Sequence, residues 1–290
     1  MLPFYRLLGQ VVVVVDLADA IRSYSSIGLD LGATERARGV ERARFGLDDG
    51  GYVELVACTD SGLPAGRDVA DFLGRGGRGL YETVVEVPGV AEVAGTRADV
   101  LVELPGDEPR WLVRLADPMA IGGARFVAVD TVDAPAALPA SSWWRRIFTH
   151  AVAVASIDAA VDAFTRIGQP LWDRSGREEW GLDTAVFRQT SGSNVEFVCP
   201  VGTERGTASV VAEFMARAGG GHYMTVFEVA DVDAVHATLV ARGVRTLGPT
   251  TAAPPESPWG PVRQMWVHPK LTHGAFIEFL TVPANEAATR

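Results

Sequence analysis

Four glutamates lie in apolar segments that are otherwise typical of buried strands. Glu196 lies within Val195–Val198 and Glu278 within Ala275–Leu280, and Glu54 and Glu82 have similar neighbours earlier in the chain. An unpaired carboxylate in such a place is costly, so each one needs a metal ion, an arginine or a proton as its partner. Carboxylates held in this way are candidates for metal ligands and for general acids or bases.

Imidazole groups that could join these carboxylates are few, because the chain contains five histidines. His150 begins an apolar run, and His222 precedes Met224 by two residues. Side chains alternate between the two faces of a strand, so we expect His222 and Met224 to face the same side. The other three histidines are expected on a solvated helix and around a turn: His236, His268 and His273.

The elements that would position these residues recur along the chain. Four blocks appear twice in the same order, about 140 residues apart, which indicates a gene duplication. The matched blocks are Gly51–Val56 with Ser193–Val198, Gly79–Val87 with Gly221–Val229, Gln10–Ile21 with His150–Val161, and Asp117–Ala124 with His268–Ala275. Glu54 thereby corresponds to Glu196.

Each half contains a smaller unit twice, because an apolar extended run precedes a helical pattern four times and strand candidates follow each helix. The expected helices are Leu17–Ser26, Val90–Ala98, Ile157–Ile167 and Val232–Arg242. The order predicts four βαβββ modules and the α+β class. A proline-containing linker at residues 133–145 would divide the chain into domains of residues 1–132 and 146–285.

The composition excludes several classes of protein. The chain has 290 residues, of which 48% are hydrophobic and 21% charged, as in ordinary globular proteins. It contains no run of 18 uncharged apolar residues, so we expect no membrane span. The net charge of −10 argues against general nucleic-acid binding. Two cysteines and an N-terminus without a signal peptide fit a cytoplasmic protein, which we expect to be a monomer or a homodimer.

The modules and the closing segment Val267–Glu278 resemble the vicinal oxygen chelate superfamily, which includes glyoxalases, bleomycin-resistance proteins and ring-cleaving dioxygenases. The resemblance covers nearly the whole chain. The His-Pro and Gly-x-x-Ile-Glu elements of the closing segment look like those of methylmalonyl-CoA epimerases in this superfamily. Its members pair βαβββ modules into cupped, mixed β-sheets, and up to four ligands on the inner face hold a divalent metal ion.

The resemblance assigns ligand positions in each half. They fall on His150, Glu196, Met224 and Glu278 in the second half, and on Gln10, Glu54, Glu82 and Val127 in the first. A thioether is a poor ligand for such ions, and His222 could replace Met224 if the strand bulges. His150 also lies one residue closer to the following Ser-Ile-Asp segment than is usual in the family.

The resemblance therefore implies a metal site made by His150, Glu196, Glu278 and His222, for Zn, Ni, Mn, Co or Fe(II). Glu196 and Glu278 are also the expected catalytic groups, and His222 and Met224 the expected substrate contacts. The first-half site is expected to be degenerate. Modules could pair within each half or across the halves, and the clean division at the linker favours pairing within halves.

Three functions follow as hypotheses. The first is a metal-dependent isomerase, epimerase or glyoxalase-type lyase that acts on a small α-oxygenated carbonyl compound. The second is an extradiol-type dioxygenase, which the absence of histidine between His150 and His222 disfavours. The third is a metal-free protein that binds a drug or metabolite, and an acidic groove would suit a cationic ligand.

Overall fold

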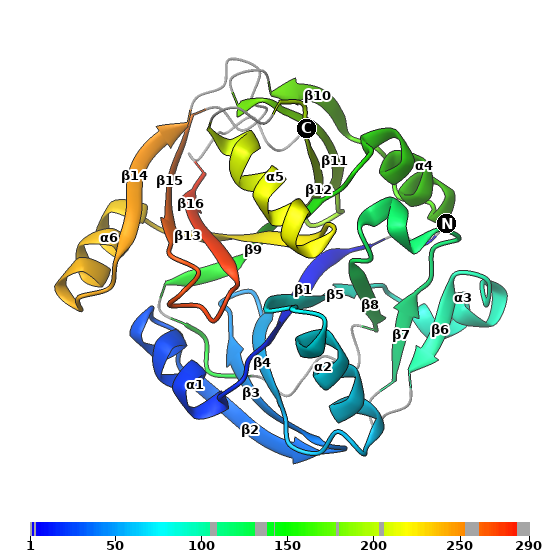
Figure 1. Cartoon of the computed structure of the whole chain (residues 1–290), viewed down its shortest axis with the longest axis horizontal. Helices are drawn as coiled ribbons and strands as arrows, with labels where there is room; N and C mark the ends of the chain where they lie inside the picture. Colours follow the sequence, from blue (N-terminus) through cyan, green and yellow to red (C-terminus); the bar gives the residue numbers. More distant parts are fainter. Residues whose placement is uncertain are drawn as a thin grey trace.

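The computed structural model describes residues 2, 4–104, 109–130, 138–141, 143–177, 180–202, 206–252 and 261–282. Two eight-stranded mixed sheets form, one from each half of the chain (Figure 1). The first half contains β1 (Arg6–Val13), α1 (Leu17–Ser26), β2 (Leu31–Ala37), β3 (Val40–Gly46), β4 (Tyr52–Cys58), α2 (Pro64–Gly74), β5 (Gly79–Glu86), α3 (Val90–Thr96), β6 (Leu101–Leu104), β7 (Arg110–Val113), the 3₁₀ helix η1 (Pro118–Ile121) and β8 (Arg125–Val129).

The second half repeats this order of strands and α-helices. It contains β9 (Trp144–Ala153), α4 (Ile157–Ile167), β10 (Asp173–Arg177), β11 (Leu182–Arg188), β12 (Asn194–Pro200), α5 (Thr207–Ala218), β13 (Gly221–Val229), α6 (Val232–Ala241), β14 (Thr246–Ala252), β15 (Val262–Val267) and β16 (Phe276–Thr281). The four predicted βαβββ modules and the α+β class are confirmed.

The modules pair within the halves. The strand orders are β2-β3-β4-β1-β5-β8-β7-β6 in the first sheet and β10-β11-β12-β9-β13-β16-β15-β14 in the second. The first strands of the two modules lie side by side and antiparallel in each sheet, β1 with β5 and β9 with β13. The pairing that the linker favoured is therefore correct.

Local capping explains why three of the four module helices begin where the sequence predicted. Asp16, Ser156 and Asp231 precede α1, α4 and α6, and each side chain accepts a hydrogen bond from a backbone N–H of the first turn. The predicted helices agree with the structure to within two residues. Two further helices, α2 and α5, connect the modules and have no capping side chain, so their starts carried no sequence signal.

The two faces of each sheet have different partners. We call the face that carries Glu54 and Glu82 the first cup, and the face that carries Glu196 and Glu278 the second cup. Helix α2 packs into the first cup through Val69, and α5 packs into the second through Ala208 and Val211. The opposite faces share one hydrophobic core with the module helices and with each other.

Aromatic rings join the halves within this common core. Phe164 of α4 contacts Phe126 of the first sheet, with ring centroids 5.3 Å apart, and Phe4, with centroids 6.1 Å apart. Trp144 is fully buried and donates a hydrogen bond from its indole nitrogen to the carbonyl oxygen of Ile27, at 3.1 Å. The two sheets are thus packed back to back as one body.

The predicted linker is only partly described. Residues 133–137 and 142 lie outside the described residues, whereas Ala140 forms an isolated parallel bridge with Gly46. Strand β9 begins at Trp144, two residues before the predicted start of the second domain. Both cysteines, Cys58 and Cys199, are free thiols. Within the described ranges, every helix is too short or too polar to span a membrane.

Candidate functional site

The strand register places the two glutamates of the second half on one face. Glu196 pairs with Ala151, and Ala151 pairs with Met224 on its other side. Glu278 pairs with Val226, two residues beyond Met224 in the same strand. Paired residues and residues two apart share a face, so Glu196, Met224 and Glu278 all face the second cup, as the sequence predicted.

His150 does not join them. It pairs with Val195 and Thr225, and it is completely buried on the opposite face, between the two sheets. A shift of one residue along a strand moves a side chain to the other face. His150 lies one residue closer to Ser156 than is usual in the family, which moves its side chain to the opposite face. Thr149, the preceding residue, therefore faces the cup. The prediction that His150 lines the metal site is therefore wrong.

His222 also faces away from the second cup. A β-bulge between His222 and Met224 pairs His222 with Val152 but Met224 with Ala151. The bulge adds one residue to β13, and His222 and Met224 therefore lie on opposite faces rather than on the same one. His222 therefore cannot take the ligand position of Met224, contrary to the expectation from the sequence.

The two histidines meet in a buried polar network at the interface between the sheets. His222 Nδ1 lies 2.6 Å from His150 Nε2, and His150 Nδ1 lies 3.1 Å from the hydroxyl of Thr225. That hydroxyl donates to Gln10 Oε1 at 3.1 Å, as does Thr83 at 3.2 Å. Gln10, predicted as a ligand position of the first half, therefore also faces the interface.

The network has a definite polarity. Thr225 donates to Gln10, so its oxygen accepts from His150 Nδ1, and His150 Nε2 accepts from His222 Nδ1. His222 Nε2 then accepts from the backbone N–H of Arg125 at 2.9 Å. Gln10 completes the chain by donating to the carbonyl oxygen of Glu82 at 2.9 Å.

Both histidines in this network are neutral. Burial lowers the pKa of His222 to about 3. Burial and the neighbouring His222 also place the pKa of His150 well below its usual value. Two neutral rings with all four nitrogens hydrogen-bonded can be buried at little cost, whereas one added proton would be expensive.

The second cup contains a carboxylic acid that keeps its proton. Glu278 is 7% exposed, and the indole nitrogen of Trp266 donates to its Oε2 at 2.9 Å. Burial raises the pKa of Glu278 to about 8; the Trp266 hydrogen bond opposes this shift, and the charge of Glu196 adds to it. Near neutral pH Glu278 is therefore largely protonated, on the same face of the sheet as Glu196.

The residues of the second cup do not fit the expected metal ion. Its ligand positions hold Thr149, Glu196, Met224 and Glu278, so the imidazole groups that Zn, Ni, Co or Fe(II) sites use are replaced by a hydroxyl and a thioether. Across the parts of the chain that the structure describes, no three His, Cys, Asp or Glu side chains form a group that could hold a metal. The predicted set of His150, Glu196, Glu278 and His222 is not brought together.

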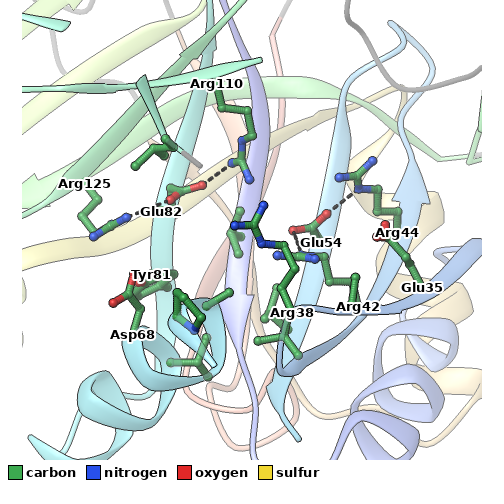
Figure 2. A pocket seen from close by; sticks show the side chains of 18 residues that line it. Glu35, Arg38, Arg42, Arg44, Glu54, Asp68, Tyr81, Glu82, Arg110 and Arg125 are labelled. Atoms are coloured by element: carbon green, nitrogen blue, oxygen red, sulfur yellow. Dashed lines mark hydrogen bonds and ion pairs between the residues drawn. The ribbon is translucent and has the colours of Figure 1, made fainter. Parts of the chain in front are cut away.

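In the first cup, arginines compensate the charge of the buried carboxylates. Glu54 and Glu82 both pair with Val11 and are nearly inaccessible. Glu54 forms ion pairs with Arg42 and Arg44, and Glu82 forms ion pairs with Arg110 and Arg125 (Figure 2).

The other two ligand positions of the first cup are apolar. Val127 is fully buried in the cup. Gly9 takes the place equivalent to Thr149, and a Cβ there would lie 2.5 Å from the ring of Tyr52. Tyr52 thus occupies the space where a ligand side chain would project.

The arginines around Glu54 and Glu82 were missed by the sequence reasoning. Arg42 and Arg44 alternate with Ala43 in β3, and Arg44 pairs directly with Glu54. An arginine pair at spacing two, opposite a glutamate in an apolar strand, was an available signal. Arg110 lies on β7, 28 residues after its partner Glu82, and the sequence gave no sign that these two residues would meet.

Comparisons with known proteins agree with this architecture. Residues 150–257 match the family model of the Glyoxalase/Bleomycin resistance protein/Dioxygenase superfamily. No curated protein matches the sequence.

Among solved structures, a variant of 4-hydroxymandelate synthase from Streptomyces coelicolor superposes with a TM-score of 0.73 at 14% identity, covering 97% of this chain and 93% of that chain. A xylose isomerase-like TIM barrel/4-hydroxyphenylpyruvate dioxygenase fusion protein gives 0.67 at 15% identity, covering 98% of this chain and 49% of that chain. Methylmalonyl-CoA epimerase from Mycobacterium tuberculosis is 24% identical over 51% of this chain and 93% of that chain, with a TM-score of 0.43. The resemblance predicted from the sequence is confirmed, and the first two structures share the tandem fold.

Proposed function

Taking the chain as a tandem member of the glyoxalase, bleomycin-resistance and dioxygenase superfamily, we propose that it is an isomerase or epimerase that moves a proton next to a carbonyl group. The substrate would be a small α-oxygenated carbonyl compound bound in the second cup. The observation that carries this proposal is the protonated Glu278 on the same inner face of the sheet as Glu196, with strands β9 and β13 between them.

The two carboxyl groups have complementary roles in this reaction. Glu278 donates its proton to the carbonyl oxygen, while Glu196 accepts the proton from the adjacent carbon, which gives an enol. Return of a proton to the carbon from either side regenerates the carbonyl compound as an isomer or epimer, and no atom or electron is lost. A carboxylic acid with a pKa near the working pH is suited to such general acid–base catalysis.

Trp266 and Met224 supply the surroundings for this chemistry. The indole N–H of Trp266 holds one oxygen of Glu278 and fixes the orientation of the acid. Met224 lies on the same face and contacts the apolar cluster under α5. We infer that Met224 is a substrate contact, and that the apolar wall excludes water from the enol.

Exchange of carbon-bound hydrogen in D₂O, followed by NMR, tests the proposal. Dihydroxyacetone, lactaldehyde and methylmalonyl-CoA serve as probes at pH 7, with a chelator present. We expect the wild type to exchange at least one probe, and Glu278→Gln to reduce the rate by about 100-fold or more. Glu92→Gln, an exposed residue of α3, is the matched control and keeps the wild-type rate. Equal rates for wild type and Glu278→Gln on every probe would contradict the proposal.

A metal-free binding protein is the second candidate. The observation that favours it is the lack of a three-donor group among the described residues. Saturable binding of a probe without any hydrogen exchange distinguishes this function from the isomerase.

A further inference from the structure

The first cup contains a pocket that the isomerase proposal does not use. Its volume is about 230 Å³, slightly below the roughly 300–1,000 Å³ of drug-sized pockets. Five arginines line it, from three strands and one turn, and Figure 2 shows them around the cavity. They are Arg38, Arg42, Arg44, Arg110 and Arg125. This concentration of positive charge is unexpected in a chain with a net charge of −10.

The arginines are more numerous than the buried carboxylates require. Glu54 lies 3.5 Å from Arg42 and closer still to Arg44, and Glu82 lies 3.6 Å from Arg125 and closer still to Arg110. One guanidinium is sufficient to neutralise one carboxylate. The second guanidinium of each group adds a desolvation cost without a buried charge to balance it.

A fifth cation has no carboxylate partner. Within the described ranges, Arg38 makes no ion pair, and Figure 2 shows its guanidinium between the Glu54 and Glu82 groups. The remaining acids of the pocket, Glu35 and Asp68, are exposed residues at its rim. The buried part of the pocket therefore has an excess of positive charge.

One polar donor in the pocket also lacks a partner. The Nε–H of Arg125 is buried and makes no hydrogen bond among the described residues. The guanidinium of Arg125 lies 5.2 Å from the centre of the Tyr81 ring, which fixes its plane. Buried donors are nearly always satisfied in folded proteins, so an orphaned one inside a pocket points to an absent acceptor.

The remaining walls set the size and shape of the acceptor. Helix α2 begins at the pocket with Pro64 and Ala65, and its N-terminus adds a positive partial charge. Val11, Val56 and Val69 form an apolar surface in the same cavity. The site offers charge-assisted hydrogen bonds at one side and an apolar surface at the other.

We propose that the first cup binds a small organic anion, whose carboxylate or phosphate group is held by Arg38 and Arg125. Arg42, Arg44 and Arg110 are fixed by Glu54 and Glu82, and they supply the surrounding positive potential. Planar guanidinium groups bind both kinds of oxyanion through paired hydrogen bonds. The site lies in the half without the acid pair, so it goes beyond the proposed function and does not depend on it.

Isothermal titration calorimetry with the full chain tests this site, using inorganic phosphate, succinate and butyrate as probes and choline as a cationic probe. We expect saturable binding of at least one anion, weaker at high salt, and no binding of choline. Phosphate binding alone would identify a phosphate ester as the ligand class, whereas succinate or butyrate binding would identify a carboxylate.

Two variants and a matched control locate the binding. Arg38→Asn keeps a residue that tolerates the positive φ of 57° at this turn, and we expect it to weaken binding by roughly tenfold. Arg125→Lys keeps the charge beside Glu82 but removes the Nε donor, and we expect a similar loss. Arg36→Asn removes an equal charge two residues away, outside the pocket, and binding changes less than about twofold.

Thermal unfolding of each variant confirms that it is folded before its affinity is compared. The proposal is overturned if the wild type binds none of the anions up to 10 mM, about the limit of specific affinity for such small molecules. It is also overturned if Arg36→Asn weakens binding as much as Arg38→Asn does, because the attraction would then come from the general surface potential.

Discussion

Both cups carry two glutamates, of which Glu54 and Glu196 are equivalent, yet the two cups stabilise these carboxyl groups in different ways. In the first cup Glu54 and Glu82 form ion pairs with arginines from neighbouring strands. In the second cup Glu278 keeps a proton on the same face of the sheet as Glu196. Arg44 pairs with Glu54, whereas Val186 takes the corresponding place beside Glu196. After duplication, a few substitutions on adjacent strands thus turned one scaffold into an arginine-rich site and an acidic one.

The largest expected effect is an opposite change in stability for the same substitution in the two cups. Glu82→Gln leaves Arg110 and Arg125 without their buried counter-charge, so we expect the free energy of unfolding to fall by about 2–4 kcal/mol. Glu278→Gln replaces a neutral acid by a neutral amide, so we expect it to stabilise the protein by roughly 3 kcal/mol at pH 7. Urea unfolding of both variants at pH 7 provides the measurement.

The sign for Glu278 follows from its pKa. The folded state holds the proton up to a pKa of about 8, whereas the unfolded chain releases it near the ordinary value of 4.5. The stability contributed by this group is complete below the lower pKa and is lost as the pH rises towards the upper one. The advantage of Glu278→Gln over the wild type should therefore grow between pH 5 and pH 8, and a constant difference would show that Glu278 is ionised.

A second, smaller effect concerns the histidines that lie in neither cup. The folded state keeps His222 neutral down to about pH 3, whereas the unfolded chain protonates it near 6.5. The stability that neutral His222 contributes is therefore complete above pH 6.5 and is lost as the pH falls below it, by roughly 2 kcal/mol at pH 5. His222→Gln should lose less stability on acidification than the wild type does. Val240→Ala changes an exposed residue of α6, so its stability should depend on pH as that of the wild type does. If the stability of the wild type, His222→Gln and Val240→Ala depended on pH in the same way, His222 would not be a buried, neutral residue of the interface.

The smallest expected effect is the recovery of a metal site in the second cup. Thr149 and Met224 hold cup-facing positions beside Glu196 and Glu278. Replacing both, Thr149→His with Met224→His, should raise the affinity for Zn²⁺ at least about tenfold over the wild type. The single replacement Val152→His, at a residue that faces the interface, should have no such effect, and calorimetric titration with Zn²⁺ separates the two designs.

The fold was largely predictable because its signals are local and repeated. The blocks that duplicate, together with the acidic or hydroxyl caps of α1, α4 and α6, determined the modules and their helix bounds. Leu63 and Gly206, the residues before helices α2 and α5, make no side-chain cap. Their stability comes from packing into the cups, which no local pattern reveals.

The candidate site was predictable only in part. Glutamates in apolar strands require a metal, an arginine or a proton, and the structure uses the last two of these. The face of His150 depended on one residue of spacing, and the face of His222 depended on a bulge that leaves no sequence mark. A register error of one residue exchanges a cup residue for an interface residue, so the two histidines lie outside the predicted ligand set although the strands were correct.

The hydrogen-bonded network between the sheets contains residues at equivalent positions of the two repeats. Gln10 and His150 are equivalent, as are Thr83 and Thr225, and all four take part in it. A symmetric homodimer must use the same residue type on both sides of such a contact. In a fused chain the two equivalent positions can hold different residue types. Here one repeat has the amide of Gln10 and the other has the imidazole of His150. Each half therefore carries polar groups that only the other half can satisfy, so neither half, expressed alone, would retain the complete network.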